Sequence, residues 1–364
     1  MDNPYNQPGS GPNGHPMPTY GPQDDEYTYV SGFGFVPTPP DVAEKQSLRS
    51  HGSALGITFV IYLLFLSFAP RIITLFFAAL LKNAMITSDG LLVAHPAVYQ
   101  IINIVISVVV YLVPFLFIYR LSVKEKRHNV YPMRVTSRGI MILSIPVSLA
   151  IAMVSMVGTN VLIELSSLLG VNASSELAVV PPAEPVALTL FIINMTVVPA
   201  VMEELVFRGV IMQSLRKFSD PMALFVSASL FSLAHMSFVK IPYTFLLGLC
   251  LGYFVMRTGS LLTGMLIHFA NNAYVLAVKL VGSNMPSAVV PIFENIMSIV
   301  LIIVGFVALL LLINRYDNMF TLRPNHGYLR VYEQLRSFAA APAMAIAVIM
   351  LVMLISYPYF VAIG

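Results

Sequence analysis

The sequence has 364 residues, of which 57% are hydrophobic and only 10% are charged, and its net charge is +3. Soluble proteins carry about 25% charged residues, so this chain has too little charge to cover a surface in water, and its solvent must be largely lipid. Its one cysteine, Cys250, excludes an intrachain disulfide and any zinc site with two or more cysteine ligands. The net charge is too small to say anything about nucleic acid, and we expect no nucleic-acid partner.

Residues 1–50 differ in composition from the rest of the chain. They are dense in Pro, Gly, Asn and Tyr and cannot form a packed core, so we expect a disordered cytoplasmic tail. A solvated extension is the favoured interpretation, and a tail that recruits a partner is the alternative. We expect no cleavable signal peptide, because no apolar stretch lies near Met1.

Residues 51–364 form a series of apolar runs, which predicts an all-α, polytopic transmembrane helix bundle of about eight or nine spans. About 20 apolar residues are needed to cross the hydrocarbon core. The nine candidate spans lie near residues 54–80, 98–119, 139–168, 187–207, 222–238, 241–256, 260–281, 288–313 and 340–362. Pro70 could kink the first run or end it early. Gly248 and Gly252 form a small-xxx-small pattern, which predicts that two helices approach closely there.

The positions of Lys and Arg indicate how the chain is oriented. If the tail is cytoplasmic and all nine runs cross, sixteen Lys and Arg residues lie in inside segments and three in outside segments. Cytoplasmic loops show such an excess of positive charge. The sequence therefore predicts a multi-pass protein with a cytoplasmic N-terminus, and the tail favours a bacterial plasma membrane.

The fourth run carries charged residues, which are costly inside a membrane and mark functional sites by default. Glu204 and Arg208 are four residues apart on one helical face and are expected to pair. Glu203 points about 100° away from Glu204 and has no local partner, which suits a general base that activates water. The alternative is that both acids are hydrated in the cytoplasmic headgroup zone.

Further polar groups lie in the fifth and seventh runs. His235 falls in the last turn of the fifth run, where the alternative to a functional role is a hydrogen-bonded core or interfacial histidine. His268 and Asn272 share one face deep in the seventh run, and Asn271 lies beside them. A His and an Asn on one such face are typical of a wet cavity, whereas an Asn alone often joins helices.

A simple ladder of helices would put these groups at different depths. At 1.5 Å per residue, His235 lies about 21 Å along the fifth run and Glu203 about 24 Å along the fourth, which runs the opposite way. We therefore predict that the fifth helix is tilted or crosses only part of the membrane.

Three short motifs occur in order on these runs. Glu203–Arg208 fits EExxxR, Phe231–His235 fits FxxxH and His268–Asn272 fits HxxxN. Together they resemble the CAAX-protease and bacteriocin-processing family, known as CPBP or Abi, over about residues 187–281. The resemblance implies an intramembrane glutamate-dependent protease whose cavity is reached from the cytoplasm or the bilayer.

The resemblance also implies a role for each site residue. Glu203 would activate the water, and His235 would position that water or bind a metal. His268 and Asn272 would stabilise the oxyanion, and the acid–base pair of the first motif would orient the site. HExxH is absent, so the zincin geometry does not apply. A metal-free water held by Glu and His is slightly favoured. A divalent metal such as zinc on Glu203, His235 and His268 is the alternative.

Together these observations predict an endopeptidase that cuts a peptide bond in a membrane-associated or lipidated peptide or protein. A prenylated CAAX protein, a peptide pheromone, a bacteriocin precursor and the tail of a membrane protein are all open as substrates. Two other functions are also open. One is a transporter or channel lined by the same polar groups, and the other is a non-catalytic immunity or scaffold protein with an idle site.

Overall fold

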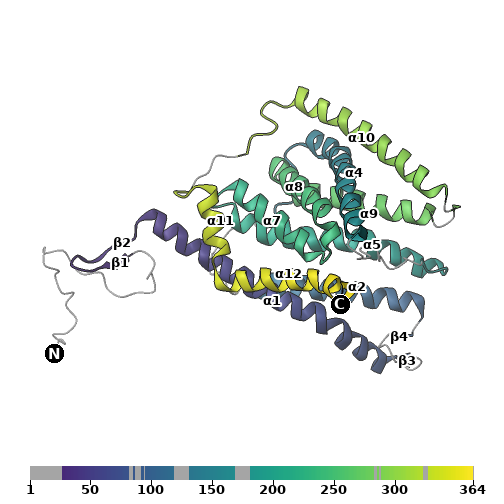
Figure 1. The fold of residues 1–364 in the computed structure, drawn as a ribbon, viewed down its shortest axis with the longest axis horizontal. Helices are drawn as coiled ribbons and strands as arrows, with labels where there is room; N and C mark the ends of the chain where they lie inside the picture. Colours follow the sequence, from purple (N-terminus) through teal and green to yellow (C-terminus); the bar gives the residue numbers. More distant parts are fainter. Residues whose placement is uncertain are drawn as a thin grey trace.

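The computed structural model describes residues 27–81, 85–86, 92–93, 95–118, 131–168, 181–282, 285–286, 288–322 and 327–363. Helices dominate this part of the chain and confirm the predicted all-α membrane bundle (Figure 1). The α-helices are α1 (Pro40–Leu80), α2 (Pro96–Leu112), α4 (Arg138–Leu168), α5 (Pro185–Glu204), α6 (Gln213–Leu215), α7 (Asp220–Ala234), α8 (Ile241–Thr258), α9 (Leu261–Gly282), α10 (Val290–Arg315), α11 (Val331–Ala339) and α12 (Pro342–Ile363). The π-helical segments η1 (Val113–Ile118) and η2 (Leu205–Met212) continue α2 and α5, and the 3₁₀ turn η3 (Phe238–Lys240) precedes α8.

The strands of the described residues are short and form two antiparallel pairs. β1 (Tyr27–Val30) pairs with β2 (Gly34–Pro37) so that Tyr27 lies opposite Pro37, and β3 (Met85–Ile86) pairs with β4 (Leu92–Val93). The β1–β2 hairpin and the start of α1 fall within the segment assigned to the tail, so the helical part begins at Pro40. Residues 1–26, to which the prediction of disorder also applies, lie outside the described residues.

The number of crossing helices differs from the nine runs seen in the sequence. In the described residues, seven helices are long and apolar enough to cross a membrane, and the pair α11 and α12, bent by 80°, could supply an eighth. α7 has 15 residues, which span about 22 Å at 1.5 Å per residue and fall short of a hydrocarbon core of about 30 Å. The fifth helix was predicted to be tilted or to cross only part of the membrane. Its length agrees with the second of these alternatives. α1 continues through Pro70 instead of ending there.

One end of the bundle joins segments that are far apart in the sequence. The N–H of Leu261, the first residue of α9, donates to the carbonyl of Pro132, which precedes α4, at 2.7 Å. Near the start of α1, buried Glu44 accepts hydrogen bonds from the Tyr328 N–H at 2.6 Å and from Gln334 Nε2 at 2.8 Å. The contacts bring together segments that the charge pattern assigns to the inside of the membrane. The cytoplasmic location of this end stays a prediction.

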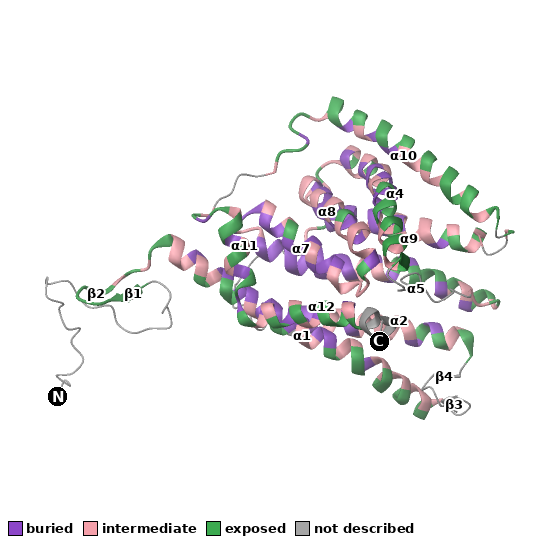
Figure 2. Ribbon diagram, in the orientation of Figure 1, coloured by how far each residue is buried: buried purple, intermediate pink, exposed green. Residues whose placement is uncertain are grey.

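Buried residues gather around the short α7 and its neighbours, while α10 presents a long exposed apolar face (Figure 2). α7 packs against α8 and η2, and α5 packs against α2 and α9. A Cβ on Gly248 would lie 3.2 Å from Ala228 Cα, and one on Gly252 would lie 2.6 Å from Leu224 Cδ1. The close helix approach predicted from the two glycines is therefore confirmed, and it joins α8 to α7.

Candidate active site

The two glutamates of the first motif lie where one helical type gives way to another. α5 ends at Glu204, and η2 continues the same rod as a π-helix from Leu205. π-Helical turns inside α-helices are rare and occur frequently at functional sites. Glu204 is fully buried and Glu203 is 8% exposed. The alternative of two hydrated surface acids therefore does not describe this site.

The predicted pair between Glu204 and Arg208 forms in the interior of the bundle. Arg208 Nη1 donates to Glu204 Oε1 at 2.7 Å, and both side chains are fully buried. Arg208 Nη2 also donates to the Gly248 carbonyl at 3.1 Å, and the guanidinium lies 4.3 Å from the centre of the Phe231 ring. One cation thus joins η2 to α8 and α7, and the first motif is fixed from three sides.

His268 of α9 lies between the two glutamates. Its Nδ1 lies 3.1 Å from Glu204 Oε1, and because an ionised carboxylate only accepts hydrogen bonds, Nδ1 must carry the proton. Its Nε2 lies 3.9 Å from Glu203 Oε2. α9 can come this close because residue 264 is glycine, where a Cβ would lie 2.5 Å from Glu204 Oε2.

Glu203 is bound differently from its neighbour. Its Oε1 accepts a hydrogen bond from the Tyr111 hydroxyl of α2 at 3.1 Å. Its Oε2 is buried and has no hydrogen-bond partner among the residues that the structure describes. Glu204 Oε2 is likewise buried and without a partner among the described residues. The two glutamates therefore differ in the groups around them: Glu203 has a neutral donor on Oε1 and His268 Nε2 at 3.9 Å from Oε2, whereas Glu204 has a cation on Oε1.

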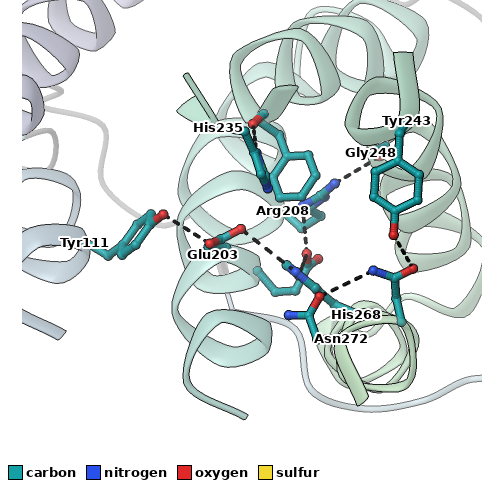
Figure 3. Close-up of polar contacts among 11 residues, drawn as sticks. Tyr111, Glu203, Arg208, His235, Tyr243, Gly248, His268 and Asn272 are labelled. Atoms are coloured by element: carbon teal, nitrogen blue, oxygen red, sulfur yellow. Dashed lines mark hydrogen bonds and ion pairs between the residues drawn. The ribbon is translucent and has the colours of Figure 1, made fainter. Parts of the chain in front are cut away.

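His235 closes the other side of the site. It caps the C-terminal end of α7, and its Nδ1 lies 2.8 Å from the Phe231 carbonyl. A carbonyl only accepts, so Nδ1 carries the proton and Nε2 is left as the acceptor of a neutral ring. The ring interacts electrostatically with Glu203 and His268, and Figure 3 shows it beside Glu203.

Asn272 lies at the end of a short chain of hydrogen bonds. The Tyr243 hydroxyl of α8 donates to Asn271 Oδ1 at 2.6 Å, and Asn271 Nδ2 donates to Asn272 Oδ1 at 3.3 Å (Figure 3). Because the oxygen of Asn272 is taken by its neighbour, the amide nitrogen is the side of the group that can serve a ligand.

The structure thus brings the six site residues predicted from the sequence into one cluster built from α5, η2, the end of α7 and α9. Sequence reasoning missed Tyr111, Tyr243 and the carbonyl of Gly248. One signal was present for Tyr111, because Gln100, Asn103, Ser107 and Tyr111 recur at helical spacing in an apolar run.

A metal site is not formed by the side chains as they lie. In the described part of the chain, no group of three or more His, Cys, Asp or Glu residues is placed to hold a metal ion. Glu203, His235 and His268 therefore do not fit a bound zinc in these positions.

The segment that builds the site matches a known family. Residues 185–274 match the family model described as type II CAAX prenyl endopeptidase Rce1-like. No curated protein and no solved structure matches the chain. The matched segment begins with α5 and ends two residues after Asn272, so all three motifs lie within it. Over this segment, the match agrees with the resemblance of the three motifs to the CPBP family of CAAX-type proteases.

Proposed function

We propose that this multi-pass membrane protein is an intramembrane endopeptidase that hydrolyses a peptide bond in a membrane-associated or lipidated peptide or protein. The observation that supports this best is the buried, unpartnered Oε2 of Glu203 beside His235 and His268. A carboxylate with one oxygen held and one available, next to two imidazoles, has the arrangement that a water-activating base requires.

In the proposed reaction, Glu203 Oε2 accepts a proton from a water molecule whose position is fixed by His235 Nε2. The water oxygen attacks the carbonyl carbon of the peptide bond, and the carbonyl oxygen becomes an oxyanion. The C–N bond then breaks, and Glu203 returns its proton to the leaving nitrogen. General acid–base catalysis of this kind contributes about 100- to 10,000-fold to a rate.

His268 and Asn272 are the donors that we propose for the oxyanion. Since His268 Nδ1 is engaged with Glu204, donation from Nε2 requires a ring that carries two protons. Removal of one oxyanion donor typically lowers kcat by about 100- to 1,000-fold.

The protease is tested by comparing peptides released in cells that carry the wild type, Glu203→Gln or Glu164→Gln. Glu164 is an exposed glutamate of α4 and serves as the matched control. New peptide termini should appear with the wild type and Glu164→Gln and be absent with Glu203→Gln. The same termini in all three strains would contradict the proposal.

The two rival functions predict other results. A transporter would carry a flux that partly survives Glu203→Gln and would release no cleaved product. A non-catalytic immunity or scaffold protein would keep its cellular phenotype with Glu203→Ala and His268→Ala. For the location, we propose a bacterial plasma membrane with the N-terminus in the cytoplasm.

A further inference from the structure

Tyr111 contacts the proposed base from outside the segment that matches the protease family. It lies on α2, 92 residues before Glu203 in the chain, and its hydroxyl donates to Glu203 Oε1 at 3.1 Å. α2 packs along α5, so this contact joins the first half of the bundle to the site. Figure 3 shows Tyr111 reaching Glu203 from the side opposite to α9.

The Tyr111 ring is itself held by aromatic neighbours. Tyr62 of α1 is 1% exposed, and its ring lies 5.6 Å from that of Tyr111, centre to centre. The two hydroxyl groups also interact. Phe115 of η1 packs on Tyr62 at 5.6 Å and on Phe207, which lies inside the EExxxR motif, at 6.4 Å. Buried aromatic contacts of this kind restrict the ring, so the hydroxyl has a defined position.

We propose that Tyr111 is a positioning residue for Glu203 in the peptide hydrolysis described above, on which this inference rests. The terminal torsion of a glutamate side chain is broad and roughly two-fold, so a carboxylate without a donor can exchange its two oxygens. The Tyr111 hydroxyl fixes Oε1 and thereby keeps Oε2 on the side of His235 and His268. Tyr111 acts through Glu203 and needs no contact with the substrate.

The test compares Tyr111→Phe with the wild type and with Tyr253→Phe, in protein reconstituted into lipid nanodiscs. Tyr111→Phe keeps the ring and removes only the hydroxyl. Tyr253→Phe is the control, because the hydroxyl of Tyr253, on α8, bonds to the carbonyl of Met319, which follows α10, and not to the site. Hydrogen-bond partners that orient metal-binding side chains are worth about 10- to 100-fold in activity, and we expect a similar factor for a partner that orients a catalytic carboxylate. Tyr111→Phe should therefore lower kcat by that factor with KM unchanged, and Tyr253→Phe should change neither.

A merely structural role would show a different pattern. It would lower the thermal stability of Tyr111→Phe, with the lost activity recovered at lower temperature and with no selective effect on kcat. Such a result, or a wild-type kcat in Tyr111→Phe, would overturn the inference. Absence of cleavage by the wild type would instead refute the proposed function, and the inference would fall with it.

Infrared spectroscopy tests the contact without any substrate. The carboxylate band that Glu203→Gln removes from the wild-type spectrum should shift in Tyr111→Phe, because a donor to that carboxylate is lost. Tyr253→Phe should leave the band in place. An unshifted band in Tyr111→Phe would show that the hydroxyl does not hold Glu203, whatever the activity of the variant.

Discussion

The replacement of Arg208 by Met tests whether the buried pair holds the site together. Met fills much of the same volume but leaves the carboxylate of Glu204, which is fully buried, without its cation. Removing one partner of a buried ion pair costs about 3–5 kcal/mol, because the remaining charge stays unpaired in a medium of low dielectric. The Gly248 carbonyl also loses its donor, so we expect a loss in this range and not below it.

The matched control is an exposed pair at the same sequence spacing. Lys45 Nζ lies 3.5 Å from Asp41 Oδ2, and these side chains are 45% and 48% exposed. Exposed pairs contribute little, about 1 kcal/mol or less, so Lys45→Met should be mild. The assay is denaturant or SDS titration in mixed micelles, which gives the free energy of unfolding of each variant. Equal losses for the two variants would refute the argument from burial.

A double variant tests whether the stability lost in Arg208→Met comes from the unpaired carboxylate of Glu204. If the cost of Arg208→Met comes from an unpaired Glu204, then adding Glu204→Gln removes that charge and should restore part of the stability. The double variant should therefore be clearly more stable than the sum of the two single losses predicts, by about 1 kcal/mol or more. Strict additivity would mean that the two side chains do not interact.

The remaining predictions concern residues that line the site. Gly264→Ala places a Cβ 2.5 Å from Glu204 Oε2, so it should lower the free energy of unfolding by about 1–3 kcal/mol and should also lower cleavage. Gly158→Ala, whose Cβ would have no neighbour closer than 3.8 Å, should change neither, and equal unfolding midpoints for the two variants would contradict the prediction. Tyr243→Phe should lower kcat by about 10-fold, because Asn271 loses the donor that orients it, and unchanged steady-state kinetics would count against that role. We expect cleavage to survive removal of metal ions by a chelator, because the described side chains form no group placed to hold a metal ion. Loss of cleavage after chelation, with recovery when zinc is added, would contradict this prediction.

Local chemistry explains which parts of the site were predictable. The pair of Glu204 and Arg208 follows from two residues one helical turn apart, and the shared face of His268 and Asn272 follows from the same periodicity. Neither needs any knowledge of how helices pack. The small-xxx-small pattern likewise predicted a close helix contact at Gly248 and Gly252, and the structure identifies the partner helix as α7.

The contacts that sequence reasoning missed all depend on packing between distant segments. Tyr111 meets Glu203 across 92 residues and Tyr243 meets Asn271 across 28, and no periodicity specifies such partners. The start of α1 was assigned to the tail because residues 40–50 are polar. Its buried Glu44 is satisfied by the Tyr328 N–H, 284 residues further on, which makes a helix at this position favourable.

Two adjacent glutamates with the same intrinsic chemistry thus acquire different environments. Glu204 has Arg208 and His268 on one oxygen, so its charge is compensated and its position is fixed. Glu203, one residue earlier, faces α2 and has only the Tyr111 hydroxyl, a neutral donor, as its hydrogen-bond partner among the described residues. A neutral donor orients a carboxylate without supplying a compensating charge, which suits the role of base that we propose for Glu203. The order of the two residues in the motif therefore matters. Glu203 points to the side where we propose that the ligand binds, and Glu204 points to Arg208. Exchanging the environments of the two glutamates would require rotating α5 by about one residue, or 100°.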